Sequence, residues 1–214
     1  MVLGIYGSGG MGRETLETAL LINRWEEIVF IDDTVEAGIY KGVRRMKYSE
    51  FRTLFLVDGA ELMIALGEPE YKISLYNKIK EDGYPLTNII HPNAVIANSV
   101  SLGVGVNIRA GAVISTDVSI GNNVTIMEHV YIGHDSVLAD NIQVSSNVSV
   151  GGHVKIGSGV FIGSNVCIKE NLSVGEGSII GIGSVVRKNV SEEMMYYNQI
   201  IPVESPKNGR KVFS

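Results

Sequence analysis

The C-terminal half of the chain is dominated by a six-residue repeat that runs from His91 to about Val190. Sixteen consecutive blocks of six, without one inserted residue, end in an aliphatic side chain, from Ile96 to Val186. The position two residues earlier is small or aliphatic, and the residue that follows is often Gly. One large apolar residue in six is too few for the apolar stripe of an amphipathic helix. A repeat of this length indicates a parallel β-helix instead.

Three strands of this kind would close a triangular coil of three blocks, because each six-residue block supplies one strand and one turn. Each coil would bury its aliphatic residues against the coils above and below, so the core would grow as a stack. We place the frequent Gly residues in turns, where their backbone freedom is needed. The repeat therefore predicts a left-handed parallel β-helix over residues 91–190, preceded by a domain over residues 1–90 and followed by a tail over residues 191–214.

The bulk composition narrows the possible functions. The chain has 214 residues and a net charge of −5, which disfavours a nucleic-acid surface. Its single cysteine, Cys167, excludes an internal disulfide framework, fits a reducing compartment and is predicted to have no special role. The apolar start is too short for a signal peptide, and no stretch suits a membrane span. We expect a cytoplasmic protein that does not insert into membranes.

The first residues carry a nucleotide-binding pattern. A short apolar strand over residues 2–6 is followed by Gly7, Gly9 and Gly12, which match G-x-G-x-x-G, and then by a helical pattern over residues 14–23 with Leu16, Ala19 and Leu20 facing inward. A second strand over residues 28–31 ends at Asp32 and Asp33, about 20 residues past the third Gly. A phosphate group would be favoured at the start of such a helix. A tight turn without a ligand is the alternative.

The remainder of this region completes a small α/β domain. A strand over residues 61–66 reaches Gly67, a helix over residues 70–81 ends near Gly83, and a last short strand covers residues 87–90. This order predicts a Rossmann-like three-layer domain. A full dinucleotide fold needs two such halves, and only one fits before the repeat, which favours a mononucleotide or nucleotide-sugar over NAD or FAD. Lys72 is predicted to meet a diphosphate or, equally, to be solvated.

Chemistry is expected where polar residues interrupt the repeat, because the core of a β-helix needs none of them. His134 and Asp135 follow a core Ile and its Gly, on a turn outside the core. A histidine can accept a proton at neutral pH, and an adjacent carboxylate can orient its ring. Gly152, one coil further on, would stack beside His134 and offer its N–H to an oxyanion. A solvated surface histidine is the alternative.

The sequence resembles the sugar acetyltransferases of the sialic-acid O-acetyltransferase type, which include bacterial UDP-4-amino-sugar and GDP-perosamine N-acetyltransferases. The resemblance covers essentially the whole chain and rests on G-S-G-G-M-G-R-E, F-I-D-D, I-A-L-G and I-I-H-P, in that order. The stretch His134-Asp135-Ser136, followed by G-H-V-K-I-G from Gly152, resembles the family's H-D-C-x-I-G and G-N-V-x-I-G segments. The same stretch is similar to the catalytic segment of the lipid A acyltransferases.

This resemblance implies a homotrimer with active sites between neighbouring β-helices and acetyl-CoA as the co-substrate, without a metal. It implies that His134 is the general base, that Asp135 orients it, and that Gly152 donates to the thioester oxygen. The implied nucleotide-sugar contacts are Gly9, Gly10, Met11, Asp32, Asp33 and Gly67. The implied acetyl-CoA contacts are Gln143, Ser164, Gly181 and Ile182.

Three departures from the family pattern limit this transfer. Gln143 and Met11 stand where some members have His, and the tail lacks the usual G-x-P-A-K/R ending. We therefore expect acetyl transfer to the amino group of a nucleotide-linked sugar in cell-surface glycan synthesis, with transfer to a sugar hydroxyl as the alternative. His129 and Glu128 would line the sugar pocket or lie on a solvated turn, and His153 would line the site or be a surface residue.

Two other classes of protein are possible. One is a zinc enzyme like the γ-type carbonic anhydrases, since His129 and His134 are five residues apart, as two zinc ligands are in that family. Their phase in the repeat differs from that family's, and Asn93 stands where the third histidine would be. The other is a non-catalytic trimeric scaffold, which the His134-Asp135 pair and the nucleotide-type first domain disfavour.

Overall fold

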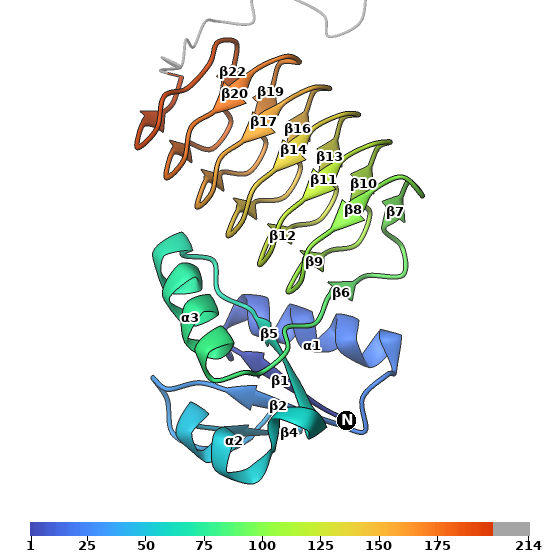
Figure 1. Ribbon diagram of the computed structural model, residues 1–214, viewed down its shortest axis with the longest axis vertical. Helices are drawn as coiled ribbons and strands as arrows, with labels where there is room; N and C mark the ends of the chain where they lie inside the picture. The colour runs from blue at the N-terminus through green and yellow to red at the C-terminus, as the bar shows by residue number, and fades with distance from the viewer. Residues whose placement is uncertain (199–214) are drawn as a thin grey trace, which may run out of the picture.

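The computed structural model describes residues 1–198, which form a small α/β domain and a stacked β-helix beside it (Figure 1). The elements of the first domain are β1 (Val2–Tyr6), α1 (Gly10–Ile22), β2 (Glu27–Ile31), β3 (Gly38–Tyr40), β4 (Val43–Met46), α2 (Tyr48–Leu54), the 3₁₀ turn η1 (Val57–Gly59), β5 (Ala60–Ile64) and α3 (Pro69–Glu81). Positions 199–214, which include most of the predicted tail, lie outside the described part.

The first domain has the three layers expected from its β-α-β pattern. Its sheet runs in the order β3-β4-β2-β1-β5, and only β3 is antiparallel to its neighbour. Leu16 and Ala19 of α1 pack on one face of the sheet, whereas Leu75 of α3 and Phe51 of α2 pack on the other. The Rossmann-like prediction is therefore confirmed, with an added β3–β4 hairpin and α2 that the sequence pattern did not reveal.

Several predicted boundaries were wrong in detail. Helix α1 begins at Gly10 rather than residue 14, and Leu20, predicted to face inward, is 54% exposed. The last strand predicted for the first domain is shorter, β6 (Ile89–Ile90), and pairs with β9 of the β-helix. The hydrogen bonding of the β-helix therefore starts at β6, just before His91. The ends of so short a strand are set by the strand with which it pairs, not by its own sequence pattern.

Two-residue strands recur every six residues from β7 to β22, and the last strand, β23, follows after a longer connection. They are β7 (Val95–Ile96), β8 (Ser101–Leu102), β9 (Asn107–Ile108), β10 (Val113–Ile114), β11 (Ser119–Ile120), β12 (Thr125–Ile126), β13 (Tyr131–Ile132), β14 (Val137–Leu138), β15 (Gln143–Val144), β16 (Ser149–Val150), β17 (Lys155–Ile156), β18 (Phe161–Ile162), β19 (Cys167–Ile168), β20 (Ser173–Val174), β21 (Ile179–Ile180), β22 (Val185–Val186) and β23 (Met195–Tyr196).

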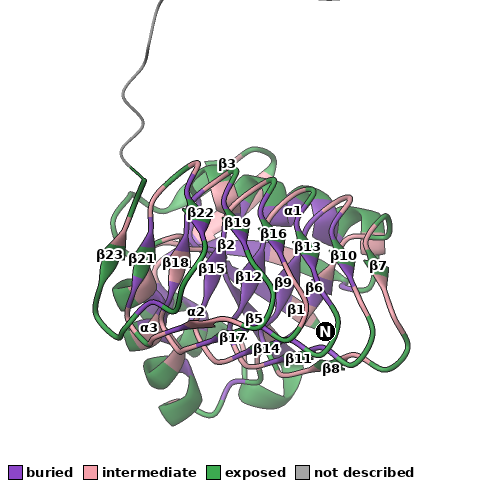
Figure 2. Ribbon diagram, turned by 90° about the horizontal axis from the view of Figure 1, so that it is seen from above, coloured by how far each residue is buried: buried purple, intermediate pink, exposed green. Residues whose placement is uncertain are grey.

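The register confirms the predicted coil of three blocks. Ile114 pairs with Ile132, and Ile132 with Val150, so the same repeat position stacks from coil to coil. The second residue of each strand and the position two before it form one continuous core, while the turns lie outside (Figure 2). This packing is that of a left-handed parallel β-helix, in which each coil is stabilised by its two neighbours.

The β-helix has three faces, which we name by what they meet. The domain-facing sheet contains β6, β9, β12, β15, β18, β21 and β23. The apolar sheet contains β7, β10, β13, β16, β19 and β22, and its outward side chains include the exposed Val95, Val113, Tyr131 and Val185. The polar sheet contains β8, β11, β14, β17 and β20, whose outward residues include Ser101, Ser119 and Lys155.

The turns require glycine for two reasons, one of which is the predicted one, since Gly105 and Gly159 have φ values of 71° and 67°. Glycines directly after the core aliphatic, such as Gly133 and Gly151, do not have positive φ. A Cβ on Gly133 would lie 2.6 Å from the backbone of Gly151 in the next coil, so close stacking excludes a side chain there. The left-handed residue comes two positions later and is Gly, Asn, Asp or His, as at Asp135 (φ 58°) and His153 (φ 57°). These residue types tolerate that conformation best.

Buried polar contacts join the two domains along the domain-facing sheet. Asn107 donates to Thr15 of α1 at 3.1 Å, and Arg109 donates to the Met11 carbonyl at 2.9 Å. Lys72 of α3 is fully buried, and its Nζ donates to Thr125 Oγ1 at 3.0 Å. Both predictions for Lys72 were wrong, because this lysine meets neither a diphosphate nor solvent. No helix in residues 1–198 is long and apolar enough to span a bilayer.

Candidate active site and nucleotide pocket

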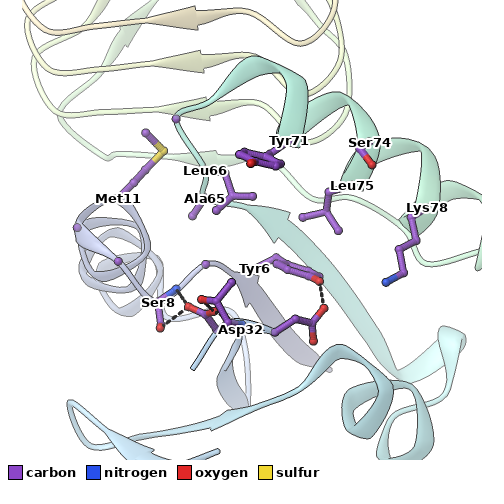
Figure 3. Close-up of a pocket in the computed structure, with 16 residues that line it drawn as sticks. Tyr6, Ser8, Met11, Asp32, Ala65, Leu66, Tyr71, Ser74, Leu75 and Lys78 are labelled. Atoms are coloured by element: carbon purple, nitrogen blue, oxygen red, sulfur yellow. Dashed lines mark hydrogen bonds between the residues drawn. The ribbon is translucent and has the colours of Figure 1, made fainter. Parts of the chain in front are cut away.

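A pocket of about 620 Å³ opens where β1, β2 and β5 end in the first domain (Figure 3). All six residues predicted to contact a nucleotide-sugar line it, namely Gly9, Gly10, Met11, Asp32, Asp33 and Gly67. Crevices at the carboxyl ends of parallel strands are the usual ligand sites of α/β sheets. The residues predicted from the glycine pattern and those predicted from the Asp-Asp strand end therefore line the same cavity.

The glycines of this turn divide into two kinds. Gly7 has a φ of 110°, and a Cβ on Gly12 would lie 2.0 Å from the Gly7 carbonyl oxygen, so both positions exclude side chains for packing reasons. A Cβ on Gly9 or Gly10 would meet nothing within 4 Å. Their bare backbone faces the pocket at the start of α1, where N–H groups and the helix dipole favour an anion.

The two aspartates at the end of β2 have different bonding. Asp32 accepts bonds from the backbone N–H and hydroxyl of Ser8, and from the backbone N–H and hydroxyl of Thr34. Burial opposes ionisation of Asp32, but these hydrogen bonds outweigh it and lower its pKa to about 2. Among residues 1–198, the donors to the Asp33 carboxylate are the Tyr48 N–H at 2.8 Å and the Tyr6 hydroxyl. A carboxylate accepts about four bonds, so Asp33 retains capacity for a ligand and Asp32 does not.

Helix α3 supplies the other wall of the pocket. Tyr71, Ser74, Leu75 and Lys78 face the cavity opposite the glycine turn (Figure 3). Their spacing of three and four positions marks one helix face, a signal that was present in the sequence. Lys78, rather than Lys72, is the cation available to a phosphate group in this pocket.

His134 and Asp135 lie on the turn between the apolar and polar sheets, which we call the His134 corner (residues 133–136 and 151–154). His134 Nδ1 is 2.7 Å from Asp135 Oδ2, and the two side chains are 53% and 45% exposed. The hydrogen bond with His134 lowers the pKa of Asp135. An ionised carboxylate only accepts, so Nδ1 carries the proton and Nε2 is left free to accept one.

Gly152 stacks against His134 as the predicted coil length requires. A Cβ on Gly152 would lie 2.7 Å from His134 Nε2, so any side chain there would displace the ring. The His153 N–H donates to the His134 carbonyl at 2.8 Å, whereas within residues 1–198 the Gly152 N–H has no protein acceptor. Buried Ser136 braces the two turns, because its hydroxyl donates to the Gly151 carbonyl and accepts from the Val154 N–H.

Within the single chain, His134 groups with Asp135 and His153 rather than with His129. His153 Nε2 lies 3.7 Å from Asp135 Oδ2, and its ring packs edge-on against His134 with centroids 5.0 Å apart. His134, Asp135 and His153 therefore make a compact group, which does not include His129. His129 sits at a left-handed turn position on a different corner, against Gly111.

The residues predicted to contact acetyl-CoA are not all together. Ser164, Gly181 and Ile182 stack on the turn between the domain-facing and apolar sheets, where the Ser164 carbonyl accepts the Gly183 N–H. We call this the Ser164 corner (residues 163–166 and 181–184). Gln143 instead lies on the domain-facing sheet beside Thr125 and is only 2% exposed. Gln143 is thus apart from the other three residues in the single chain, and its contact with acetyl-CoA stays a prediction.

The three predicted sets of residues lie on three different sides of one chain. The nucleotide pocket belongs to the domain that covers the domain-facing sheet, whereas the His134 corner is the edge opposite that sheet. The Ser164 corner lies at the other border of the apolar sheet. A ligand held by one chain's pocket therefore cannot approach that chain's own His134 across the β-helix.

Comparisons with known proteins agree with both domains. Residues 2–79 match the family described as the PglD N-terminal domain. The chain is similar to WeeI from Acinetobacter baumannii AYE, with a TM-score of 0.88 and 24% identity over 92% of this chain and 97% of that one. It is similar to the acetyltransferase domain of PglB from Neisseria gonorrhoeae FA1090 in complex with acetyl coenzyme A, with a TM-score of 0.86 and 24% identity over 91% and 94%.

A third similar structure is the H141N mutant of perosamine N-acetyltransferase from Caulobacter crescentus in complex with CoA and GDP-perosamine. Its TM-score is 0.86, with 25% identity over 92% of this chain and 94% of that one. These likenesses span both domains, so the pairing of this α/β domain with this β-helix is a shared architecture.

Proposed function

We propose that this chain is a bacterial nucleotide-sugar acetyltransferase that transfers an acetyl group from acetyl-CoA to an amino group of a nucleotide-linked sugar, as the match of its first domain and its whole-chain fold support. The observation that carries the proposal is the His134-Asp135 pair with Gly152 stacked on the ring, in a chain that also has an anion-favouring nucleotide pocket. The structures complexed with acetyl-CoA or with CoA and GDP-perosamine support the two substrate classes.

In the proposed mechanism, the neutral sugar amine attacks the thioester carbonyl carbon while His134 Nε2 accepts the amine proton. Asp135 holds Nδ1–H and stabilises the imidazolium that forms. The Gly152 N–H donates to the oxyanion, and the carbon–sulfur bond then breaks to release coenzyme A, which takes up a proton as the thiol. No covalent enzyme intermediate is required, and a protonated amine must first lose a proton.

A direct assay tests this function. The purified chain is mixed with acetyl-CoA and a panel of UDP-, GDP- and dTDP-linked 4-amino sugars, and products are identified by mass. We expect one acetyl group added per coenzyme A released with at least one amino sugar. The matching sugars with a hydroxyl in place of the amine serve as controls. Acetylation of those hydroxyl sugars alone would replace N-transfer by O-transfer, and no acetylation of any sugar would contradict the proposal.

We further propose that the active enzyme is a homotrimer around the apolar sheet. Val113 and Tyr131 are 38% and 42% exposed on this face, which has no partner in the single chain. In a three-fold ring with the apolar sheets facing the axis, the His134 corner of one copy meets the Ser164 corner of the next. This cyclic contact would join the predicted catalytic and acetyl-CoA residues, which one chain keeps apart.

Placing a charge on the apolar sheet is expected to break this trimer. The Val113→Lys variant should dissociate toward monomers and lose most acetyl transfer, because three lysines would have to be buried near the axis. Val137→Lys, at a similarly exposed valine of the polar sheet, is the matched control and should stay trimeric and active. Light scattering and activity are measured on both. A fully active wild-type monomer would contradict the assembly.

The two aspartates of the pocket should respond differently to amidation. Asp33→Asn is expected to raise KM for the nucleotide-sugar by about tenfold to a hundredfold, the value of a hydrogen bond to a charged group, with little change in kcat. Asp32→Asn should instead lower the melting temperature by a few degrees, because two of its four internal donors would face an amide N–H₂. Steady-state kinetics and thermal unfolding distinguish the two. An unchanged KM in Asp33→Asn would contradict its role in binding.

A further inference from the structure

The His134 corner carries a second arrangement of side chains that acetyl transfer does not need. Asp135 and His153 are one coil apart, so they occupy the same left-handed turn position in adjacent coils, with φ values of 58° and 57°. Together with His134, they place one ligand atom each within 4.8 Å of one another. The register of the β-helix, rather than a mobile loop, therefore holds two imidazoles and a carboxylate together.

We propose that His134, Asp135 and His153 form an inhibitory binding site for Zn²⁺. Two histidines and one carboxylate, with water in the fourth position, are a set of ligands that zinc accepts. Tetrahedral zinc with bonds of about 2.0–2.1 Å needs ligand atoms about 3.3 Å apart. Two of the three separations here are 2.7 Å from His134 Nδ1 to Asp135 Oδ2 and 3.7 Å from His153 Nε2 to the same oxygen. The third, between the two imidazoles, is within 4.8 Å, so side-chain rotations must bring all three to the required value.

In the single chain the three side chains are open to an ion from solvent. Those of His134 and His153 are each 53% exposed, and that of Asp135 is 45% exposed. Among residues 1–198, zinc would displace the His134–Asp135 hydrogen bond, whose two atoms become ligands themselves. The site is therefore formed without unfolding any part of the turn.

Zinc at this position would inhibit the reaction through the tautomer of His134, an inference that rests on the proposed function. When the metal takes the lone pair of Nδ1, the single ring proton moves from Nδ1 to Nε2. Nε2 then donates instead of accepting and cannot take a proton from the sugar amine. Asp135 is also withdrawn from its orienting role, because its oxygen binds the metal.

Calorimetric titration of ZnCl₂ into the metal-free full-length protein tests the site without reference to activity. We expect one Zn²⁺ per chain, with affinity at least tenfold weaker in His153→Asn, since asparagine tolerates the left-handed turn but removes the imidazole. His91→Asn removes a histidine more than two coils before the site and should bind like the wild type. Cys167→Ser, which removes the exposed thiol, should also bind like the wild type. Equal affinity of wild type and His153→Asn would overturn the proposal.

Inhibition is measured separately, as initial rates followed by loss of thioester absorbance, because released coenzyme A would itself bind zinc. We expect Zn²⁺ to inhibit the wild type reversibly, with recovery on adding EDTA. His153→Asn, measured against its own rate without zinc, should need at least tenfold more zinc for the same fractional inhibition. Zinc binding at His153 without inhibition would overturn the inhibitory role, whereas inactive protein that still binds zinc there would count against the proposed function and not against the site.

Discussion

Replacing His134 by alanine is expected to lower kcat for acetyl transfer by about 10²–10⁴-fold, the usual contribution of a general base. The ring accepts the amine proton at Nε2, and Asp135 holds the opposite nitrogen at 2.7 Å. Thermal stability should change little, because the side chain is half exposed and lies outside the core of the β-helix. Single-turnover and steady-state rates on the substrate found in the sugar panel measure the loss.

A matched histidine separates a catalytic effect from a general effect of the turns. His91→Asn removes a histidine at the start of the β-helix, more than two coils before His134, so it should retain turnover close to the wild type. Gly152→Ala adds the opposite control, because its Cβ would displace the His134 ring while both catalytic side chains remain. That variant should fall toward the activity of His134→Ala. Turnover near the wild type in His134→Ala would remove this histidine from the mechanism.

The β-helix could be predicted from the sequence because each of its coils contacts only its neighbours at a fixed spacing. A shift of one coil therefore brought Gly152 beside His134 without any structural information. The role of the turn residues was predicted only in part, since it depends on backbone conformation rather than spacing. Asp135 and His153 both adopt the left-handed conformation of this turn position, which few residue types tolerate. Their side chains also lie beside His134, so a backbone requirement and a chemical role favour the same residues.

The nucleotide pocket was predicted to a similar extent, because a strand, a glycine turn, a helix and an acidic strand end follow one another closely in the chain. Its second wall was not predicted, since Lys78 reaches the pocket only through the packing of α3 on the sheet. The division between Asp32 and Asp33 was also outside the reach of the sequence. It depends on Ser8, Tyr6 and Tyr48, which reach the two carboxylates from other elements.

Contacts between the two domains could not be predicted from local sequence patterns. Gln143 occupies the outward position of its strand, where repeat phase alone predicts exposure, yet it is only 2% exposed. Lys72 is buried against the domain-facing sheet, where it contacts Thr125 and Ile142. No periodicity within either segment indicates which helix face meets which distant strand. The wrong prediction for Lys72 therefore has one physical origin, which is the docking of α3 on the β-helix.

The burial of Lys72 is expected to have a large effect on the stability of the folded protein. Its ammonium is fully buried, donating to Thr125 Oγ1 at 3.0 Å and more weakly to the Ile142 carbonyl at 3.4 Å. Burial lowers the pKa of Lys72 from 10.5 to about 7. The unfolded chain thus binds an extra proton between pH 7 and 10.5, so this group makes folding more favourable as the pH rises through that window. Below pH 7 the folded protein bears the full cost of a buried charge.

Lys72→Met is accordingly expected to stabilise the protein at pH 6 by about 1–4 kcal/mol, because a similar apolar volume replaces a poorly compensated charge. The difference from the wild type should shrink at pH 9, where the wild-type amine is largely neutral. Urea unfolding midpoints at both pH values measure this, with the exposed Lys80→Met of the same helix as a control that should show no such trend. A less stable Lys72→Met at pH 6 would mean that the Lys72–Thr125 bond outweighs the burial of charge, and that this lysine holds the two domains together.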